Sequence, residues 1–290
     1  RLRRTATAAA GPRPRPGPGT FHRAGGRAPG HGAVTRRARS ALLVLVLLWS
    51  LPAATLERYG YRVLDKRAPP RDNFVQGLEF DGDTLLLGSG LYGRSRLRRY
   101  AFPSMELLAE QRLPGRLFGE GITRVGDRIF LLTWPARVGL IFDADALRPT
   151  HRFSLPGQGW GLTHNDRALI YSDGSARLRF LDPDTLRVRR QLTVTRAGEA
   201  LPRLNELEWI DGRIWANVWT TDRVVIIHPR SGIVEAEVDL DGLLPVPERR
   251  ADTDVLNGIA HHPASGGIWV TGKRWPWLYR IELRPQGASQ

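Results

Sequence analysis

The sequence predicts an all-β protein in which a unit of several short strands is repeated. A short phrase occurs five times, as QGLEF (76–80), EGITR (120–124), WGLTH (160–164), NELEW (205–209) and NGIAH (257–261). The second positions of successive copies are 44, 40, 45 and 52 residues apart, and no stretch after residue 60 has the periodicity of a helix. A period of about 40–50 residues is typical of a β-propeller blade. We therefore predict a five-bladed β-propeller, with a six-bladed ring as the alternative because the last spacing is long.

The strands of each repeat follow the phrase in the same order. Runs rich in β-branched and aliphatic residues predict second strands at 84–90, 128–134, 168–174, 213–219 and 267–273. Third strands are predicted at 96–102, 138–144, 177–183, 223–229 and 277–283, and fourth strands at 105–113, 149–155, 187–194 and 233–240. The pairs Asp81-Gly82, Gly126-Asp127 and Asp211-Gly212 fall between first and second strands, where a tight hairpin turn is required.

The last repeat has no fourth strand, and a strand-like segment at 61–67 (YRVLDKR) precedes the first repeat. We predict that this N-terminal strand pairs with the last blade and closes the ring, which removes exposed sheet edges. The domain organisation that follows is a disordered basic tail with a signal-like apolar segment at 1–57, the propeller at 58–284 and a C-terminal tail at 285–290.

The positive charge of the chain is concentrated at its start. The formal net charge is +14, but residues 1–40 contain ten arginines and no acidic residue, which leaves about +4 for the rest. The basic surplus therefore belongs to the tail, and we do not expect the folded part to bind nucleic acid. The segment RPRPGPG is too poor in apolar residues to order itself.

An apolar run at 41–51 (ALLVLVLLWSL) follows the basic segment TRRARS and precedes the small residues PAAT. This order is typical of a secretory signal, and the run is short for a membrane span. We therefore expect an exported protein, periplasmic or secreted, that meets the membrane only during export. An uncleaved membrane anchor is the alternative. We expect translation to start within the basic region, with Val34 as the candidate.

Composition excludes several kinds of chemistry. The chain has no cysteine, so it has no disulfide and no cysteine-based zinc site. The histidines show no metal-ligand spacing, and the pair His261-His262 points to opposite faces of a strand. No GxSxG motif and no phosphate-binding loop is present. The chain has 41 arginines but only two lysines, Lys66 and Lys273, which singles out each lysine for attention.

Repeat position predicts which residues meet at one mouth of the ring. The first residues of the five phrases are Gln76, Glu120, Trp160, Asn205 and Asn257, and the ends of the second strands are Ser89, Trp134, Asp173, Trp219 and Lys273. Singly, a tryptophan here is more often a packing residue, and an asparagine more often caps a turn. Together they combine aromatic walls with a few polar groups, which is the composition of a pocket for a small polar ligand. A desolvated carboxylate in such a pocket suits proton transfer.

Several motifs resemble the glutamine cyclotransferase family of plants and bacteria. They are FVQGLEF, FGEGI, GWGLT, SDGSARLRFLDPDTL, LNELEWIDGRIWANVW and DVLNGIA followed by VTGKRWP, and they span about residues 58–284. The family is a five-bladed propeller and differs from the zinc-dependent animal-type enzyme. The resemblance implies conversion of the N-terminal glutamine of peptides or proteins to pyroglutamate with release of ammonia, without metal or cofactor. We expect a monomer.

The resemblance also implies roles for individual residues. Glu120 in FGEG matches the proposed acid/base of the family. The residues that match its substrate-binding pocket are Phe74, Gln76, Phe118, Trp134, Trp160, Asn205, Trp219 and Lys273. The loop TWPARVG is shorter than in many relatives and carries Pro135, while GSGLYGRS keeps the family outline with Leu91 and Tyr92 in the loop. We expect the substrate range to differ at these edges.

Two other functions compete with this interpretation. A calcium-dependent lactonase requires several convergent oxygen ligands, whereas the predicted mouth has one clear glutamate and much tryptophan. A non-catalytic propeller that binds peptides of the cell envelope is the second alternative. Retention of Glu120 and Lys273 favours the enzyme.

Overall fold

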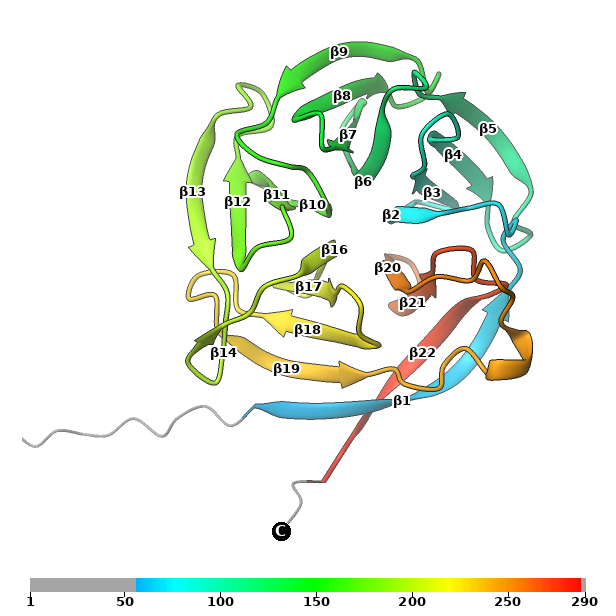
Figure 1. Ribbon diagram of the computed structural model, residues 1–290, viewed down its shortest axis with the longest axis vertical. Helices are drawn as coiled ribbons and strands as arrows, with labels where there is room; N and C mark the ends of the chain where they lie inside the picture. The colour runs from blue at the N-terminus through cyan, green and yellow to red at the C-terminus, as the bar shows by residue number, and fades with distance from the viewer. Residues whose placement is uncertain (1–55, 288–290) are drawn as a thin grey trace, which may run out of the picture. The chain divides into compact units, whose positions relative to one another are not determined.

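The computed structural model describes residues 56–287, and these form an all-β structure without an α-helix. Three sheets have four antiparallel strands each, in the predicted order (Figure 1). They contain β2 (Val75–Asp81), β3 (Thr84–Ser89), β4 (Arg96–Ala101) and β5 (Leu107–Arg112); β6 (Phe118–Val125), β7 (Arg128–Trp134), β8 (Val138–Asp143) and β9 (Pro149–Ser154); and β10 (Leu162–Asn165), β11 (Ala168–Ser172), β12 (Arg177–Leu181) and β13 (Val188–Thr193). The predicted signal-like segment lies outside the described residues.

The remaining long strands form one eight-stranded sheet. In order across the sheet these are β16 (Leu204–Ile210), β17 (Arg213–Val218), β18 (Arg223–Ile227), β19 (Val234–Asp239), β1 (Glu57–Arg67), β22 (Leu278–Pro285), β21 (Gly267–Gly272) and β20 (Leu256–His262). A short hairpin, β14 (Thr195–Arg196) with β15 (Glu199–Ala200), and a 3₁₀ turn at Val246–Glu248 complete the described elements. No helix within residues 56–287 is long and apolar enough to cross a membrane.

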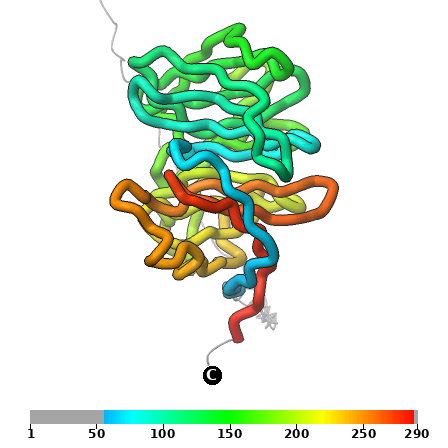
Figure 2. Tube along the Cα trace, turned by 90° about the vertical axis from the view of Figure 1, so that its right-hand side faces the viewer, coloured from blue at the N-terminus to red at the C-terminus, as the bar shows by residue number. Residues whose placement is uncertain are grey.

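The predicted pairing of the N-terminal strand with the last repeat is confirmed. β1 runs antiparallel to β22 from Tyr59, opposite Pro285, to Arg67, opposite Leu278. Figure 2 shows these first and last segments, blue and red, side by side. The strand begins at Glu57, four residues earlier than predicted, because its first residues continue past β22 and pair in parallel with β19. That second pairing joins the last two repeats into one sheet.

The sheets surround a common centre, toward which each presents its first strand (Figure 1). These inner strands, β2, β6, β10, β16 and β20, each contact the next. Apolar side chains on both faces of the sheets fill the space between neighbours, as in the cluster that joins Leu86 and Leu97 to Ile122 and Phe142. Burial on both faces explains why the second strands are nearly continuous apolar runs rather than alternating ones.

Glycine at the second position of the phrase is required by the close approach of the inner strands. A Cβ at Gly161 would lie 1.9 Å from the backbone oxygen of Asn205, and a Cβ at Gly77 would lie 2.5 Å from the backbone nitrogen of Ile122. Real Cβ atoms do not approach backbone so closely, so any larger residue would push the strands apart. The repeated phrase is thus a packing motif at its second residue, which leaves the first residue free to vary.

Candidate active site

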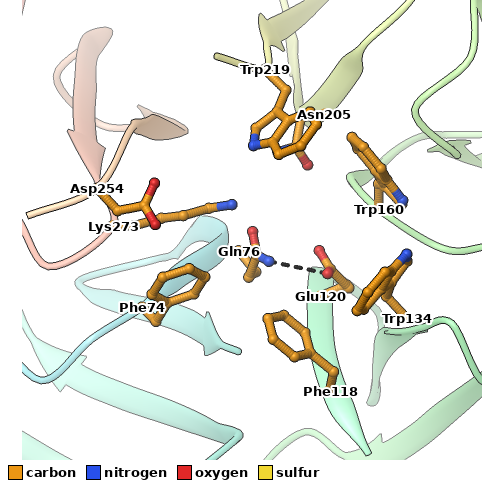
Figure 3. A pocket seen from close by; sticks show the side chains of 10 residues that line it. All are labelled: Phe74, Gln76, Phe118, Glu120, Trp134, Trp160, Asn205, Trp219, Asp254 and Lys273. Carbon is orange, nitrogen blue, oxygen red and sulfur yellow. Dashed lines mark hydrogen bonds between the residues drawn. The ribbon is translucent and has the colours of Figure 1, made fainter. Parts of the chain in front are cut away.

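One cavity of about 250 Å³ collects the residues that repeat position and family resemblance singled out (Figure 3). All nine predicted site residues line it, and one further residue, Asp254, joins them. The lining residues are Phe74, Gln76, Phe118, Glu120, Trp134, Trp160, Asn205, Trp219, Asp254 and Lys273. They come from loops and strand ends distributed around the whole ring, so the cavity exists only when the ring is complete. The roles of these residues stay a prediction.

The polar residues of the cavity lie at irregularities in the inner strands. The pairing of β2 with β3 shifts register between Val75 and Gly77, and that of β6 with β7 shifts between Gly119 and Ile122. Gln76 and Glu120 lie within these shifts, and Asn205 lies in the matching shift of β16. A bulge leaves a residue outside the hydrogen-bonded ladder and re-aims its side chain. The same local feature therefore turns each polar side chain toward the cavity.

Glu120 is held by a hydrogen bond from a neighbouring repeat. The Gln76 amide nitrogen donates to Glu120 Oε1 at 3.0 Å (Figure 3). Asn257 Nδ2 donates to Gln76 Oε1 at 3.2 Å and to the Val75 carbonyl at 3.0 Å. Because Asn257 occupies the carbonyl end of the Gln76 amide, the amino end faces Glu120. The orientation of the Gln76 side chain is thus determined by two inner strands together.

Glu120 and Lys273 are both buried in the cavity, and each influences the pKa of the other. Glu120 is 5% exposed and Lys273 is 4% exposed. Burial raises the pKa of Glu120 well above its ordinary value, and the Lys273 ammonium opposes the rise. Burial likewise lowers the pKa of Lys273, against the attraction of Glu120 and Asp254. The carboxyl group can therefore exchange a proton much closer to neutral pH than an exposed glutamate.

Asn205 presents an unoccupied acceptor to the cavity. The residue is buried, and its backbone carbonyl accepts a hydrogen bond from Ser172 Oγ at 2.7 Å. Its side-chain oxygen has no hydrogen-bond partner among the described residues. A buried acceptor without a partner is costly, so this oxygen is suited to a donor supplied by a ligand.

Aromatic rings form the walls of the cavity. The ring of Phe118 packs edge-to-face with Phe74 at 6.1 Å and with Trp134 at 5.7 Å, and Trp160 packs with Trp219 at 5.3 Å between centroids. Such contacts fix ring positions and exclude water from the polar groups below. Lys273 Nζ lies 5.0 Å from the centroid of Phe74, a distance at which the ring face stabilises a cation.

Two residues near the cavity have no counterpart in the repeat pattern. Gln158 accepts hydrogen bonds from the indole nitrogens of Trp134, at 2.9 Å, and Trp160, at 3.2 Å, and so aligns two walls. Asp254 places an exposed carboxylate at the side of Lys273 (Figure 3). Both lie in loops that differ between repeats, so repeat position could not identify them. Their polar character beside a phrase was the only sequence signal.

Three residues predicted at the mouth lie outside the cavity. Asn257 is fully buried behind Gln76, because its amide bridges β20 and β2. Ser89 Oγ accepts the Phe74 backbone N–H at 3.0 Å. Burial alone would raise the pKa of the Asp173 carboxyl group. Hydrogen bonds from Arg179 and Ser175 have the larger combined effect, so its net pKa is lowered. Each of these side chains is engaged in hydrogen bonds within the protein instead of facing a ligand.

Three buried glutamates of the inner strands do not line the cavity, and no role was predicted for them. Glu206 accepts the backbone N–H groups of Leu78, at 3.2 Å, and Ile259, at 2.9 Å. Glu208 accepts the His261 N–H at 3.0 Å, and Glu79 accepts the Arg124 N–H at 3.0 Å. The glutamates thus bridge strands of different repeats near the centre of the ring. Among residues 56–287 no three potential metal ligands of the His, Cys, Asp or Glu type are grouped.

These glutamates make stability depend on pH. Burial raises the pKa of Glu79 from 4.5 to about 7. Between these values the folded protein binds more protons than the unfolded chain, so the free energy of unfolding falls as pH rises through this window. We expect Glu79→Gln to remove about 1–3 kcal/mol of this decline, measured by urea unfolding at about pH 5 and about pH 8. The exposed Glu106→Gln is the control. An unchanged pH dependence in Glu79→Gln would contradict the assignment.

The fold and the cavity define an all-β ring protein with a pocket suited to acid–base chemistry on a small polar ligand. A family model described as glutamine cyclotransferase matches residues 39–283. A glutaminyl-peptide cyclotransferase of Arabidopsis thaliana is 37% identical over 224 residues, which cover 75% of this chain and 69% of the relative. The crystal structure of Myxococcus xanthus glutaminyl cyclase matches with a TM-score of 0.74 at 29% identity, covering 80% of this chain and 100% of that chain. The chain belongs to the glutamine cyclotransferase family, as its motifs predicted.

Proposed function

We propose that this protein is a glutaminyl-peptide cyclotransferase that converts an N-terminal glutamine to pyroglutamate and releases ammonia. The observation that carries the proposal is the buried Glu120 carboxyl, hydrogen-bonded to Gln76 and facing Lys273 inside an aromatic-walled cavity. The cavity volume of about 250 Å³ suits one amino-acid side chain with its α-amine. Membership of the glutamine cyclotransferase family supports the same activity.

The reaction requires one group that moves a proton twice. The α-ammonium of the substrate, with a pKa of roughly 8, must lose a proton before its nitrogen attacks the γ-carboxamide carbon. That first proton leaves to solvent, and the ionised Glu120 carboxylate accepts the second proton from the attacking amine nitrogen as the new C–N bond forms and the carbonyl oxygen becomes an oxyanion. Glu120 then returns the proton to the amide nitrogen as the old C–N bond breaks and ammonia leaves. A carboxyl group with a raised pKa suits both steps, because it is a stronger base when ionised and remains a competent acid.

The other polar groups hold the reactants in place. The amine and the carboxamide belong to the same molecule, so much of the barrier is overcome by fixing them in a reactive geometry. The free acceptor oxygen of Asn205 suits an N–H of the substrate. The Lys273 ammonium, buried opposite Glu120, stabilises the oxyanion. The aromatic walls cover the aliphatic part of the glutamine side chain.

Loss of the Lys273 ammonium should affect both rate and pH dependence. We expect Lys273→Met, which keeps the unbranched shape and most of the length of the side chain, to lower kcat/KM about 100-fold. Because Lys273 opposes the rise in the pKa of Glu120, its removal should also move the acidic limb of the kcat/KM profile to higher pH. A full pH–rate profile of both proteins measures this. A lower rate with an unmoved acidic limb would argue against the coupling of Lys273 to Glu120.

We also propose that the ring has five blades. In this description the eight-stranded sheet consists of two blades, β16–β19 and β20–β22 with β1, joined by the parallel pairing of β1 with β19. The five inner strands that contact in sequence and the five apolar clusters support it. We further propose that the protein is exported and acts as a monomer. N-terminal sequencing of the mature protein and light scattering test these two points.

Ammonia release tests the activity itself. The purified protein should release ammonia from a peptide that begins with glutamine and has a free α-amine. It should release none from the same peptide with an acetylated amine, because the nucleophile is then blocked. A strong chelator should leave the rate unchanged. Ammonia release from the acetylated peptide would indicate simple amide hydrolysis, and loss of the reaction with chelator would contradict a metal-independent reaction.

A further inference from the structure

A second cavity, of about 500 Å³, is formed by loops that also build the active-site cavity. Five arginines line it, namely Arg71, Arg94, Arg96, Arg112 and Arg274. We refer to this cavity as the arginine cleft. It lies where the loops before β2 and β20 and the loops after β3 and β21 come together. The mechanism proposed above does not use it.

The arginine cleft begins where one wall of the active-site cavity ends. Arg274 directly follows Lys273, and its guanidinium carbon lies 5.8 Å from the centroid of the Phe74 ring. On the other side Leu91, which lines the cleft, precedes Tyr92, whose ring packs on Phe118 at 5.5 Å. A peptide with its first residue in the active-site cavity that leaves over Phe74 and Phe118 therefore enters the arginine cleft.

The acidic residues of the cleft are already paired. Asp252 Oδ2 lies 3.2 Å from Arg274 Nη1. Asp72 accepts two hydrogen bonds from Arg98, at 2.8 and 2.9 Å, which lower the pKa of its carboxyl group and keep it ionised and engaged. Asp72 Oδ2 also lies 3.4 Å from Arg96 Nη1, and Glu110 pairs with Arg96 at 3.1 Å and with Arg112 at 3.3 Å. Three of the five arginines are thus already paired with carboxylates.

Two arginines of the cleft lack a carboxylate partner. Within the described part of the chain, no carboxylate oxygen lies within 4.0 Å of the side-chain nitrogens of Arg71 or Arg94. The buried Nη1 of Arg71 has no hydrogen-bond partner there at all, while Nη2 donates to the Glu248 carbonyl at 3.2 Å. An unpartnered buried guanidinium nitrogen favours an acceptor supplied from outside. Arginine matches the geometry of carboxylates in particular.

We propose that the arginine cleft binds acidic side chains that follow the N-terminal glutamine of the substrate. The inference rests on the proposed function and specifies its substrate class as peptides or proteins with an acidic N-terminal segment. The cleft contributes through ground-state binding of a remote part of the substrate, so it lowers KM more than it raises kcat. The charges also attract acidic segments before contact, which makes the preference sensitive to salt.

The test compares peptides of equal length that begin with Gln-Gly and continue with glutamates, with glutamines or with lysines. At low ionic strength, kcat/KM for the acidic peptide should exceed that for the glutamine peptide by about fivefold, which is the size expected of a few exposed ion pairs. The lysine peptide should be the poorest substrate. The difference should lie in KM and largely vanish at about 0.5 M salt, where charges are screened within a few ångström.

A charge-reversal variant locates the effect. Arg94 is exposed, and its backbone alone takes part in local hydrogen bonds, so Arg94→Glu should fold normally. The ratio of kcat/KM for acidic to basic peptide should fall at least fivefold in this variant. Arg71→Gln should lower the ratio in the same direction. Arg167→Glu, in the exposed hairpin turn at the end of β10 that points away from the pocket, is the matched control and should keep the parent ratio.

The outcomes separate the two proposals. If the glutamine peptide is not cyclised at all, the proposed function fails. If it is cyclised and the three peptides react equally at low salt, or if Arg94→Glu and Arg167→Glu change the ratio equally, the arginine cleft is not a substrate site and only this inference fails.

Discussion

Glu120→Gln should reduce kcat/KM for cyclisation of a glutamine peptide by about 10³-fold or more, because proton transfer by a positioned side chain contributes about 10²–10⁴-fold and Glu120 performs it twice. The substituted amide has nearly the same size, and its oxygen can still accept the hydrogen bond from Gln76. Replacing a buried carboxyl group by a neutral amide also removes a desolvation cost. The free energy of unfolding should therefore be equal to or higher than that of the parent protein.

Three measurements are required for this variant. Steady-state ammonia release gives kcat/KM, and urea unfolding with circular dichroism establishes that the fold is intact. Binding of the glutamine peptide, measured by quenching of the cavity tryptophans, should persist within a fewfold, because the walls are unchanged. A folded Glu120→Gln protein that retains full turnover would show that another group carries the proton.

Glu206→Ala should destabilise the fold by about 3–5 kcal/mol, because it leaves two buried N–H donors, those of Leu78 and Ile259, without acceptors at about 1–3 kcal/mol each, and removes buried side-chain volume. Glu206 is 1% exposed and ties strands β2 and β20 to β16. Glu206→Gln keeps one acceptor oxygen, so we expect an intermediate loss. Urea unfolding at neutral pH measures both variants.

The exposed Glu199→Ala provides the control and should change stability by less than about 0.5 kcal/mol. If Glu206→Ala lost no more than this control, the strand-bridging role of Glu206 would be wrong. The other four copies of the phrase have glycine at the position of Glu206. Only in β16 does the second phrase position carry a side chain, and that side chain supplies acceptors to strands of two other repeats.

The strand order was predictable because each repeat carries the same apolar pattern and turn residues. Gly126-Asp127 and Asp211-Gly212 lie between first and second strands, as predicted, whereas Asp81 ends β2 and the turn there is Gly82-Asp83. Gly82, Gly126 and Gly212 all have positive φ. The extra length of β1 was not predictable, because its first residues are ordered by β19, which is more than 170 residues away in the sequence. Long-range pairing of an exposed edge leaves little trace in local composition.

The cavity was predictable to the extent that it follows repeat position. Gln76, Glu120 and Asn205 lie in equivalent irregularities of their strands, so equal position in the phrase gave equal direction in space. Asn257 has the same position but points elsewhere, because Gln76 and Val75 accept its hydrogen bonds. Asp254 was missed because it lies in a loop without a counterpart in the other repeats.

The bridging role of the glutamates has a signal in the sequence, namely an acidic residue at the fourth position of the phrase. Glu79 and Glu208 share the fourth position of the phrase, two residues beyond the glycine or glutamate at the second position. Alternation along a strand places these positions on the same side, toward the centre of the ring. An acidic residue on that side is unusual unless it accepts hydrogen bonds there, as both do.

Product analysis of a stoichiometric reaction tests the central claim most directly. The protein is mixed with an equal amount of a peptide that begins with glutamine, and the peptide is examined by mass spectrometry and by Edman degradation. We predict that the peptide loses one molecule of ammonia and becomes blocked at its N-terminus, and that Glu120→Gln leaves it unchanged over the same time. A peptide that binds to the parent protein but keeps its mass and its free amine would contradict the account and identify the cavity as a peptide-binding site.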